Sequence, residues 1–346
     1  MKHTLLLLLL GCYTVLVQAQ DKSGKEPYMT KPLSNDAIKN VEVQTSGGGI
    51  SVAGVSASSA RIEVYIQSNR GNENLSKEEI QRRLDADYNL DISMASNKLT
   101  AIAKPKEKNM DWKKALNISF KVFVPQAVST NLSTSGGSIS LENLSGSQDF
   151  STSGGSLNIA NVTGKVKGRT SGGNIQVSDS KDDIDLNTSG GSIDASNCIG
   201  NIKLHTSGGS LQIAGLKGKV EAQTSGGSVG GRNIEGELAA HTSGGNVKLS
   251  DLSCSLETST SGGHIDVAIK DLGKYVTISN SGGNIDLQLP RSKGVDLKLH
   301  GGKIKTDTLN NFSGSVDEDE IEGKLNGGGM PVTVRAGSGR INLSLK

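Results

Sequence analysis

The chain has 346 residues, including 45 glycines, and its 37 lysines and arginines nearly balance its 35 aspartates and glutamates. Glycine is about twice as frequent as in an average protein, while aromatic residues make up only 3% of the chain. This composition excludes collagen, because glycine does not recur at every third residue, and the balanced charge gives no sign of a nucleic-acid partner.

The first 19 residues have the features of a secretory signal peptide. A short basic start precedes an apolar run from Leu5 to Val17, which is too short to span a bilayer, and cleavage after Ala19 fits the small-residue rule. The alternative is a lipoprotein signal with a lipid anchor on Cys12, but it would shorten the apolar run. We therefore expect an exported protein, in the periplasm, at the outer surface or outside the cell, with no transmembrane segment.

The region before residue 126 divides into three predicted parts. Residues 20–40 are polar and predict a flexible N-terminus, whereas residues 41–66 alternate between apolar and polar as solenoid coils do. In residues 67–125 this frame breaks. Ser76 opens a capping-box motif that predicts a helix to about Leu84. Strands are expected after it at residues 90–93, 99–103 and 118–124.

A tetrapeptide repeat, Thr-Ser-Gly-Gly, dominates the chain after residue 130. Eight copies follow one another at a constant spacing of 18 residues, from Thr134 to Thr260, and an isolated copy begins at Thr45. Degenerate copies begin at Asn280 and His300. A fixed period of this size is typical of a solenoid or a repeat array.

Aligning the copies, with the threonine as position 1, places similar residues in columns. Positions 6, 8, 11 and 15 are mainly branched aliphatic residues, whereas positions 7, 14, 16 and 18 are polar. This alternation has the period of a β-strand, and the Ser-Gly-Gly segment and positions 9–13 predict turns in which glycine supplies positive φ angles. A disordered linker of similar composition would not need aliphatic columns.

No single unit can bury its own apolar edge, so each unit must stack on the next at the strand spacing of about 4.8 Å. We therefore predict an all-β protein over residues 126–346: a single-stranded, right-handed β-solenoid (β-helix) of 18-residue coils. Residues 67–125 are interpreted as an α+β cap over its N-terminal end, because an uncovered end exposes a strand edge. This segment also holds Trp112 and much of the aromatic content, so a separate ligand-binding insertion is the alternative.

The coils and the Phe120-Lys121-Val122-Phe123-Val124-Pro125 strand before them resemble the bacterial family named "putative adhesin domain". The resemblance covers roughly residues 40–346. It implies a β-helix and a cell-envelope or extracellular setting. It brings no catalytic residues with it.

Motifs for catalysis or metal binding are not found in the sequence. The Gly-Lys pairs are not followed by Ser or Thr, as a phosphate loop requires, and no zinc motif occurs. The turn from Gly190 to Asp194 lacks the third glycine of calcium-binding repeats. His205 and His241 share outward position 18, with Gln223 between them, and are expected to be solvated. We expect no catalytic, cofactor-binding or metal-binding residues, and no cofactor.

Three further columns have structural interpretations. Position 16 alternates in charge, which keeps like charges apart in neighbouring coils. The position-1 threonines are expected to point inward with their hydroxyls paired along the column, rather than outward as a binding array. Cys198 and Cys254 fall at different positions, three coils apart, and should be unpaired core thiols.

The sequence thus predicts an exported, non-enzymatic β-solenoid that is a monomer and displays a surface for adhesion. Its partner would be a glycan or a protein at the cell surface. A polysaccharide-active β-helix enzyme is the main alternative, which would require acidic residues clustered with Arg or Lys on one outward sheet. A protein that senses or regulates envelope stress is a third possibility.

Overall fold

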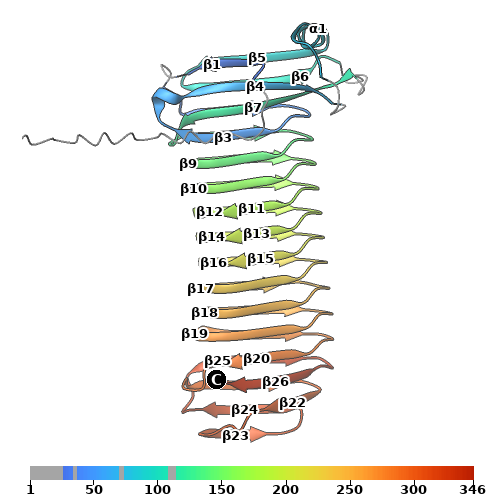
Figure 1. Ribbon diagram of the computed structural model, residues 1–346. Coiled ribbons are helices and arrows are strands. Elements are labelled where there is room, and N and C mark those ends of the chain that lie inside the picture. The colour runs from blue at the N-terminus through green and yellow to red at the C-terminus, as the bar shows by residue number, and fades with distance from the viewer. Residues whose placement is uncertain (1–25, 34–36, 70–73, 108–113) are drawn as a thin grey trace, which may run out of the picture.

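The computed structural model describes residues 26–33, 37–69, 74–107 and 114–346. These residues form an all-β molecule in which the strands are stacked as the tiers of a tall column, with the N-terminal part at one end and the C-terminal part at the other (Figure 1). One α-helix, α1 (Lys77–Asp87), and one short 3₁₀ helix (Ala57–Ser59) occur among them. The predicted all-β, solenoid-like architecture is confirmed. The expected signal peptide, Cys12 and Trp112 lie outside the described residues.

In the central coils, from β9 to β18, strand residues pair with the residue 18 positions further along the chain. Leu157 is opposite Ile175, and Val166 is opposite Ile184, in parallel register. Each coil has a short strand at positions 6–9 and a longer strand ending at the next threonine; in some coils the two are continuous. These strands are β9 (Ile139–Thr152), β10 (Leu157–Thr170), β11 (Ile175–Ser178), β12 (Lys181–Thr188), β13 (Ile193–Ser196), β14 (Ile199–Thr206), β15 (Leu211–Ala214), β16 (Lys217–Thr224), β17 (Val229–His241), β18 (Val247–Thr260) and β19 (Ile265–Asn280).

The aliphatic columns fill the space between the stack of short strands and the stack of longer strands. Leu157, Val166 and Leu211 have no exposed surface, and the threonines of position 1 are also buried. Burying such a side chain contributes roughly 1.5–3 kcal/mol. The column therefore has a continuous core that no single coil could form.

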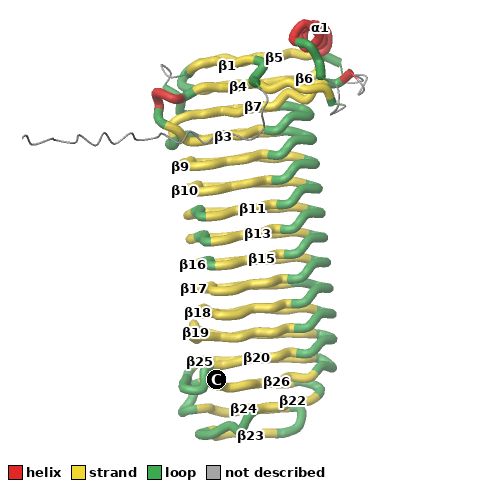
Figure 2. The backbone as a smooth tube through the Cα atoms, viewed as in Figure 1, coloured by secondary structure: helices red, strands yellow, loops and turns green. Residues whose placement is uncertain are grey.

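The Thr-Ser-Gly-Gly turns stack along one edge of the column, where Figure 2 shows a row of loops. Thr206 illustrates their chemistry: its Oγ1 donates to the carbonyl of Gly191 in the preceding coil at 2.7 Å and accepts from the Gly209 N–H at 3.2 Å. The inward orientation of the threonines was predicted, but the expected pairing between hydroxyls was wrong. Each hydroxyl binds backbone groups instead, because the turn leaves those groups unpaired.

The second glycine of this turn is required by close packing rather than by a positive φ angle. A Cβ on Gly209 would overlap the carbonyl of Gly191, whereas a Cβ on Gly208 would lie 3.5 Å from its nearest neighbour, the Ser189 oxygen. Neither residue has a positive φ, so the expectation of left-handed glycines here was wrong. The positive φ angles expected in the other turn are confirmed at positions 10 and 13, where asparagine and aspartate adopt them as well as glycine. They include Asn143, Asn161, Asp179, Asn197, Gly215, Asn233 and Asp251 at position 10, and Gly146, Gly164, Asp182, Gly200, Gly218 and Gly236 at position 13.

At the N-terminal end, the coils do not follow the order of the sequence. The coil made by β2 and β3 lies between the coil of β6 and β7 and the coil of β8 and β9, with parallel pairing on both sides. The isolated Thr45 turn belongs to this coil, and its hydroxyl donates to the Ile118 carbonyl at 2.7 Å. The strands involved are β2 (Asn40–Gln44), β3 (Ile50–Val55), β6 (Lys98–Pro105), β7 (Leu116–Pro125) and β8 (Ser129–Ser133).

Antiparallel strands and α1 lie beyond the last N-terminal coil (Figure 1). They are β1 (Met29–Pro32), β4 (Arg61–Ser68) and β5 (Tyr88–Ala95); β4 pairs with β7, β5 with β6, and β1 with β4. The helix and strands expected in residues 67–125 are all present, and Ser76 caps α1 by accepting from the Glu79 N–H. The expectation that residues 20–40 are flexible is corrected for β1, because its backbone pairs with β4.

The C-terminal end is interleaved in the same way. The last coil, β25 and β26, lies between the coil of β19 and β20 and the coil of β21 and β22. β24 then pairs antiparallel with β21, and β23 with β24. These strands are β20 (Ile285–Leu289), β21 (Val295–His300), β22 (Lys303–Thr306), β23 (Phe312–Val316), β24 (Glu320–Leu325), β25 (Met330–Ala336) and β26 (Arg340–Leu345).

Candidate functional site

The outward side chains at positions 7 and 9 of the short strands form one exposed surface, which we call the polar face. They are mostly short amides, hydroxyls and acids. Three shallow depressions lie along this face. The polar face comprises Ser140, Glu142, Asn158, Ala160, Gln176, Ser178, Asp194, Ser196, Gln212, Ala214, Gly230, Arg232, Lys248, Ser250, Asp266 and Ala268.

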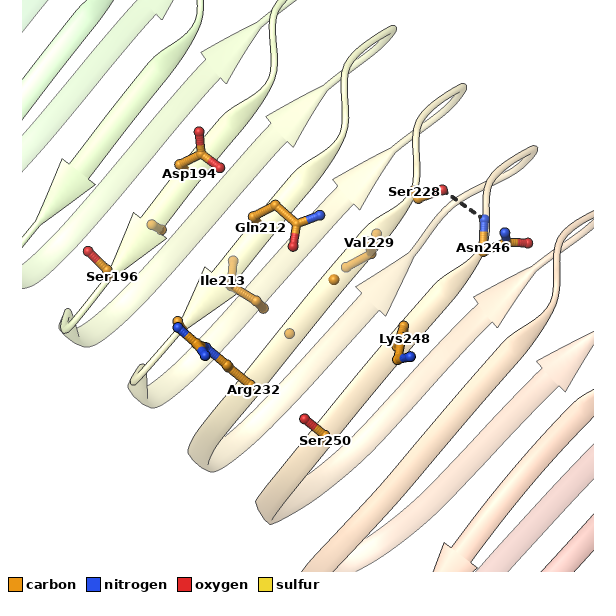
Figure 3. Close-up of a pocket in the computed structure, with 14 residues that line it drawn as sticks. Asp194, Ser196, Gln212, Ile213, Ser228, Val229, Arg232, Asn246, Lys248 and Ser250 are labelled. Carbon is orange, nitrogen blue, oxygen red and sulfur yellow. Dashed lines mark hydrogen bonds between the residues drawn. The ribbon is translucent and has the colours of Figure 1, made fainter.

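The depression at the middle of the polar face surrounds Gly230 and Gly231 of β17, and we call it the notch (Figure 3). At position 7, Gly230 lies between Gln212 and Lys248, so the row of outward side chains is interrupted there. The depression has a volume of about 670 Å³ and is open to solvent. Its polar lining comprises Asp194, Ser196, Gln212, Ser228, Arg232, Asn246, Lys248 and Ser250.

The interior beneath the notch is packed, although Gly231 lacks the aliphatic side chain that position 8 usually carries. A Cβ on Gly231 would lie 2.7 Å from a Leu249 methyl group and 3.1 Å from side-chain carbons of Ile213 and Ile234. These neighbours occupy the space, so the glycine does not leave a hole in the core. On the outer side, the Gln212 amide lies over Gly230.

Several polar groups of the notch have hydrogen-bonding capacity to spare. Asp194, Gln212 and Arg232 make no side-chain hydrogen bond or ion pair within the described part of the chain. Ser228 Oγ accepts from the Asn246 N–H at 3.1 Å, and Asn246 Oδ1 accepts from the His264 N–H at 2.8 Å. The serine hydroxyl hydrogen and the asparagine NH₂ group can therefore still donate to a ligand.

The stack of longer strands carries the outward positions 14, 16 and 18, which we call the charged face. The predicted charge alternation is confirmed by the register, in which Lys203 lies between Asp185 and Glu221. Lys217 and Glu235 form a nearby exposed ion pair at 2.9 Å. Exposed pairs contribute well under about 1 kcal/mol each, so these charges act mainly by avoiding repulsion.

The two histidines of position 18 lie on the charged face, separated by Gln223 as expected. Both are half-buried rather than fully solvated. His241 Nδ1 lies 2.8 Å from Ser259 Oγ of the next coil, so the prediction of a solvated side chain was wrong for His241. The structure does not bring the two histidines together.

The two cysteines of the described chain are both buried and unpaired, which confirms their predicted role as core thiols. Burial raises the pKa of the Cys198 thiol, and it raises that of Cys254 to about 12. A thiol that stays protonated is a poor nucleophile, so the geometry favours a packing role for both.

Within the described ranges, no three His, Cys, Asp or Glu side chains are grouped so that they could hold a metal ion. Asp194, the acid of the calcium-like turn, lies on the polar face and lines the notch. No helix among the described residues has the length and apolar character needed to cross a membrane.

The notch was not identified from the sequence, although its glycines stand out in the alignment of the repeats. Gly230 and Gly231 replace a polar and an aliphatic residue at columns 7 and 8. A gap in an outward column can mark a ligand surface or a neutral substitution. The packing around the two glycines shows that the core beneath them is filled and that the depression lies on the outer surface.

The comparisons with known proteins give the following findings. The family model described as Toastrack DUF4097 matches residues 177–344, somewhat less than half of the chain. No curated protein matches the chain.

Two solved structures are similar over most of their length. A "putative cell adhesion protein" from Clostridium sporogenes is 11% identical, with 92% of this chain and 98% of that chain covered and a TM-score of 0.18. A "putative adhesin" from Bacteroides fragilis is 12% identical, with 92% and 96% covered and a TM-score of 0.24. Identity and superposition are both low, so these names describe those two proteins alone.

Proposed function

We propose that the protein is an exported, non-enzymatic adhesion protein of the cell envelope that binds a glycan on its polar face. The observation that carries this proposal is the notch, where amide, hydroxyl and charged groups surround an open depression and keep unused hydrogen-bonding capacity. The single-chain, right-handed winding of the coils, the monomeric state and export by the signal peptide belong to the same proposal.

The chemistry of the polar face favours a glycan over a protein partner. Amides and hydroxyls both donate and accept, so they can match the hydroxyl groups of a sugar. Protein interfaces usually have an apolar core with aromatic anchors. Among the described residues, the exposed large apolar side chains are Ile199 and Val316, and neither lies on the polar face.

The stacking of coils supports this function because it holds the polar groups at fixed spacing. Each side chain of column 7 lies one strand spacing, about 4.8 Å, from the next. A surface that is already ordered loses little conformational entropy on binding. An elongated ligand lying along the column could therefore contact several coils at once.

A matched pair of variants tests the proposal. Gly230→Gln fills the notch with the residue that neighbouring coils carry, whereas Ala239→Gln adds the same side chain to the same strand but on the charged face. On a glycan array, Gly230→Gln should lose binding while Ala239→Gln and the wild type bind alike. Melting temperatures of both variants should stay close to that of the wild type.

Two results would contradict the proposal. Release of reducing ends from a bound polysaccharide would identify an enzyme. Binding to cells that is abolished by protease but survives periodate oxidation of sugars would identify a protein partner.

A further inference from the structure

The notch differs from its surroundings in its charge. Arg232 projects at position 9 from β17, and in Figure 3 its side chain extends from its own strand toward the preceding coil. Its neighbours in the register are Ala214 and Ser250, so no carboxylate lies beside it in its column. The guanidinium forms no ion pair with any residue that the structure describes.

A second cation lies at the other side of Gly230. The Lys248 ammonium is 3.8 Å from Asp266, and both side chains are strongly exposed, at 79% and 45%. Such a loose, solvated pair holds the lysine weakly, so a ligand could compete for it. Asp194 is the one acid of the notch, and it lies two coils away from Gly230 in column 7.

The lysines at position 16 of the charged face are in a different situation. Lys203 has acids in the register on both sides, and so does Lys167, which lies between Asp149 and Asp185. Their charges are balanced within the protein. The lining of the notch therefore combines an open depression with two cations, Arg232 and Lys248, and one acid, Asp194, whereas each of these two lysines of the charged face has an acid on both sides.

From these observations we infer that the notch binds an acidic sugar, with Arg232 binding its carboxylate. A guanidinium presents two parallel N–H groups that match the two oxygens of a carboxylate, which a neutral sugar lacks. Lys248 adds a second positive charge, and Gln212, Ser228 and Asn246 supply donors and acceptors for the sugar hydroxyls. This inference rests on the proposed glycan function and assigns the class of its ligand.

Polygalacturonate, a polymer of a uronic acid, and its methyl ester provide a matched pair of probes. Binding of both polymers to the mature protein can be measured by titration calorimetry at fixed ionic strength. The wild type should bind the acid form about tenfold more tightly than the ester, as expected for hydrogen bonds to a charged group. Arg232→Gln should lose this preference.

Arg169→Gln is the matched control. Arg169 is an exposed arginine on the charged face whose neighbours in the register, Ser151 and Asn187, are also uncharged. This variant should keep the wild-type preference for the acid form.

The outcomes separate the inference from the proposed function. Equal binding of acid and ester by the wild type, or an equal loss of preference in both variants, would overturn the acidic-sugar inference and leave glycan binding in place. Binding of neither polymer would count against the inference, and an empty glycan array in addition would remove the proposed function itself.

Discussion

At the residue scale, the Thr-Ser-Gly-Gly motif joins neighbouring coils through its threonine hydroxyl and its second glycine, which contact the same backbone carbonyl of the preceding coil. The carbonyl of each second glycine accepts a hydrogen bond from the threonine of the next coil, as in Thr224 to Gly209 at 2.8 Å. The same carbonyl approaches the second glycine of that coil so closely that no Cβ fits. The threonine and the glycine are therefore required together.

Because of this arrangement, we expect the two adjacent glycines of the motif to respond differently to substitution by alanine. Gly209→Ala places a methyl group against the Gly191 carbonyl, and we expect it to lower the free energy of unfolding by about 3 kcal/mol or more. Gly208→Ala has room, and a less flexible unfolded chain should leave stability unchanged or raise it by up to about 1 kcal/mol. Urea denaturation of both variants measures the difference. Equal losses would refute this account of the turn.

The buried thiol of Cys254 makes stability depend on pH. Its pKa is raised by burial from 9.0 to about 12, so the folded state binds the proton more tightly than the unfolded state. The contribution of this thiol to the free energy of unfolding is constant below pH 9. It falls by about 1.4 kcal/mol per pH unit as the pH rises toward 12. Melting temperatures of wild type and Cys254→Ala, compared between pH 8 and about 11, should therefore converge as the pH rises. A constant difference in melting temperature would show that the pKa of the thiol is not raised in the folded state.

At the element scale, the strands of a central coil pair with those of the coils before and after it in the sequence, but the strands at the two ends of the column do not follow this order. Residues 67–125 contain β6 and β7, which pair along β2 and β3, together with α1 and β5. We propose that this segment covers the N-terminal end. Ile80 and Leu84 of α1 are buried in the common core, which supports a covering role for the helix.

Deletion of residues 67–125 tests this role. It would remove the parallel partners of β2 and β3 and expose two strand edges with their apolar side chains, and such edges pair with other chains. The shortened protein should therefore oligomerise or aggregate in size-exclusion chromatography with light scattering. A stable monomer that has only lost ligand binding would instead support the alternative of a separate binding insertion.

The alignment of repeats was sufficient to predict the strands, the inward columns and the separation of Cys198 from Cys254. These follow from alternation and from a constant period, which are local properties. The role of the glycine at position 4 could not be predicted, because it depends on how closely two coils approach. The hydrogen bond of His241 to Ser259 also arises between coils, and nothing in the local sequence indicates it.

The order of the terminal coils could not be predicted from the sequence either. The residues from Val41 to Val52 have the frame of a coil, and that frame is compatible with any neighbouring coil. The alignment also shows Gly230 as a missing side chain, but it does not show the depression, the position of the Gln212 amide or the unpaired Arg232. These depend on how the residues of four successive coils are placed together.

At the scale of the whole molecule, the last coil holds the C-terminal tiers in place. β21 and β22 reach the rest of the column through β25 and β26. Val332, Val334, Ile341 and Leu343 of these two strands are almost completely buried. Each such side chain contributes roughly 1.5–3 kcal/mol of burial energy, so the last coil has a large share in the stability of this end.

A chain that ends after Gly329 should therefore lose the order of residues 293–325 while the central coils remain intact. Limited proteolysis followed by mass spectrometry should show rapid cleavage within that segment and continued protection of residues 134–260. Protection of residues 293–325 equal to that in the full chain would mean that β21 and β22 can pair with β19 and β20 directly.

The interleaved ends also affect the order in which a newly synthesised chain can fold. Synthesis begins at the N-terminus, so β2 and β3 emerge before both of the coils that flank them, and they must wait for residues 98–152. Each central coil, by contrast, can pair with the preceding coil, which has already been synthesised, as soon as its own residues are available. The last coil must enter between two coils that were made earlier. Contacts between distant parts of the chain are slow to form, so the ends, rather than the long repeat between them, set the time that the protein needs to reach its native state.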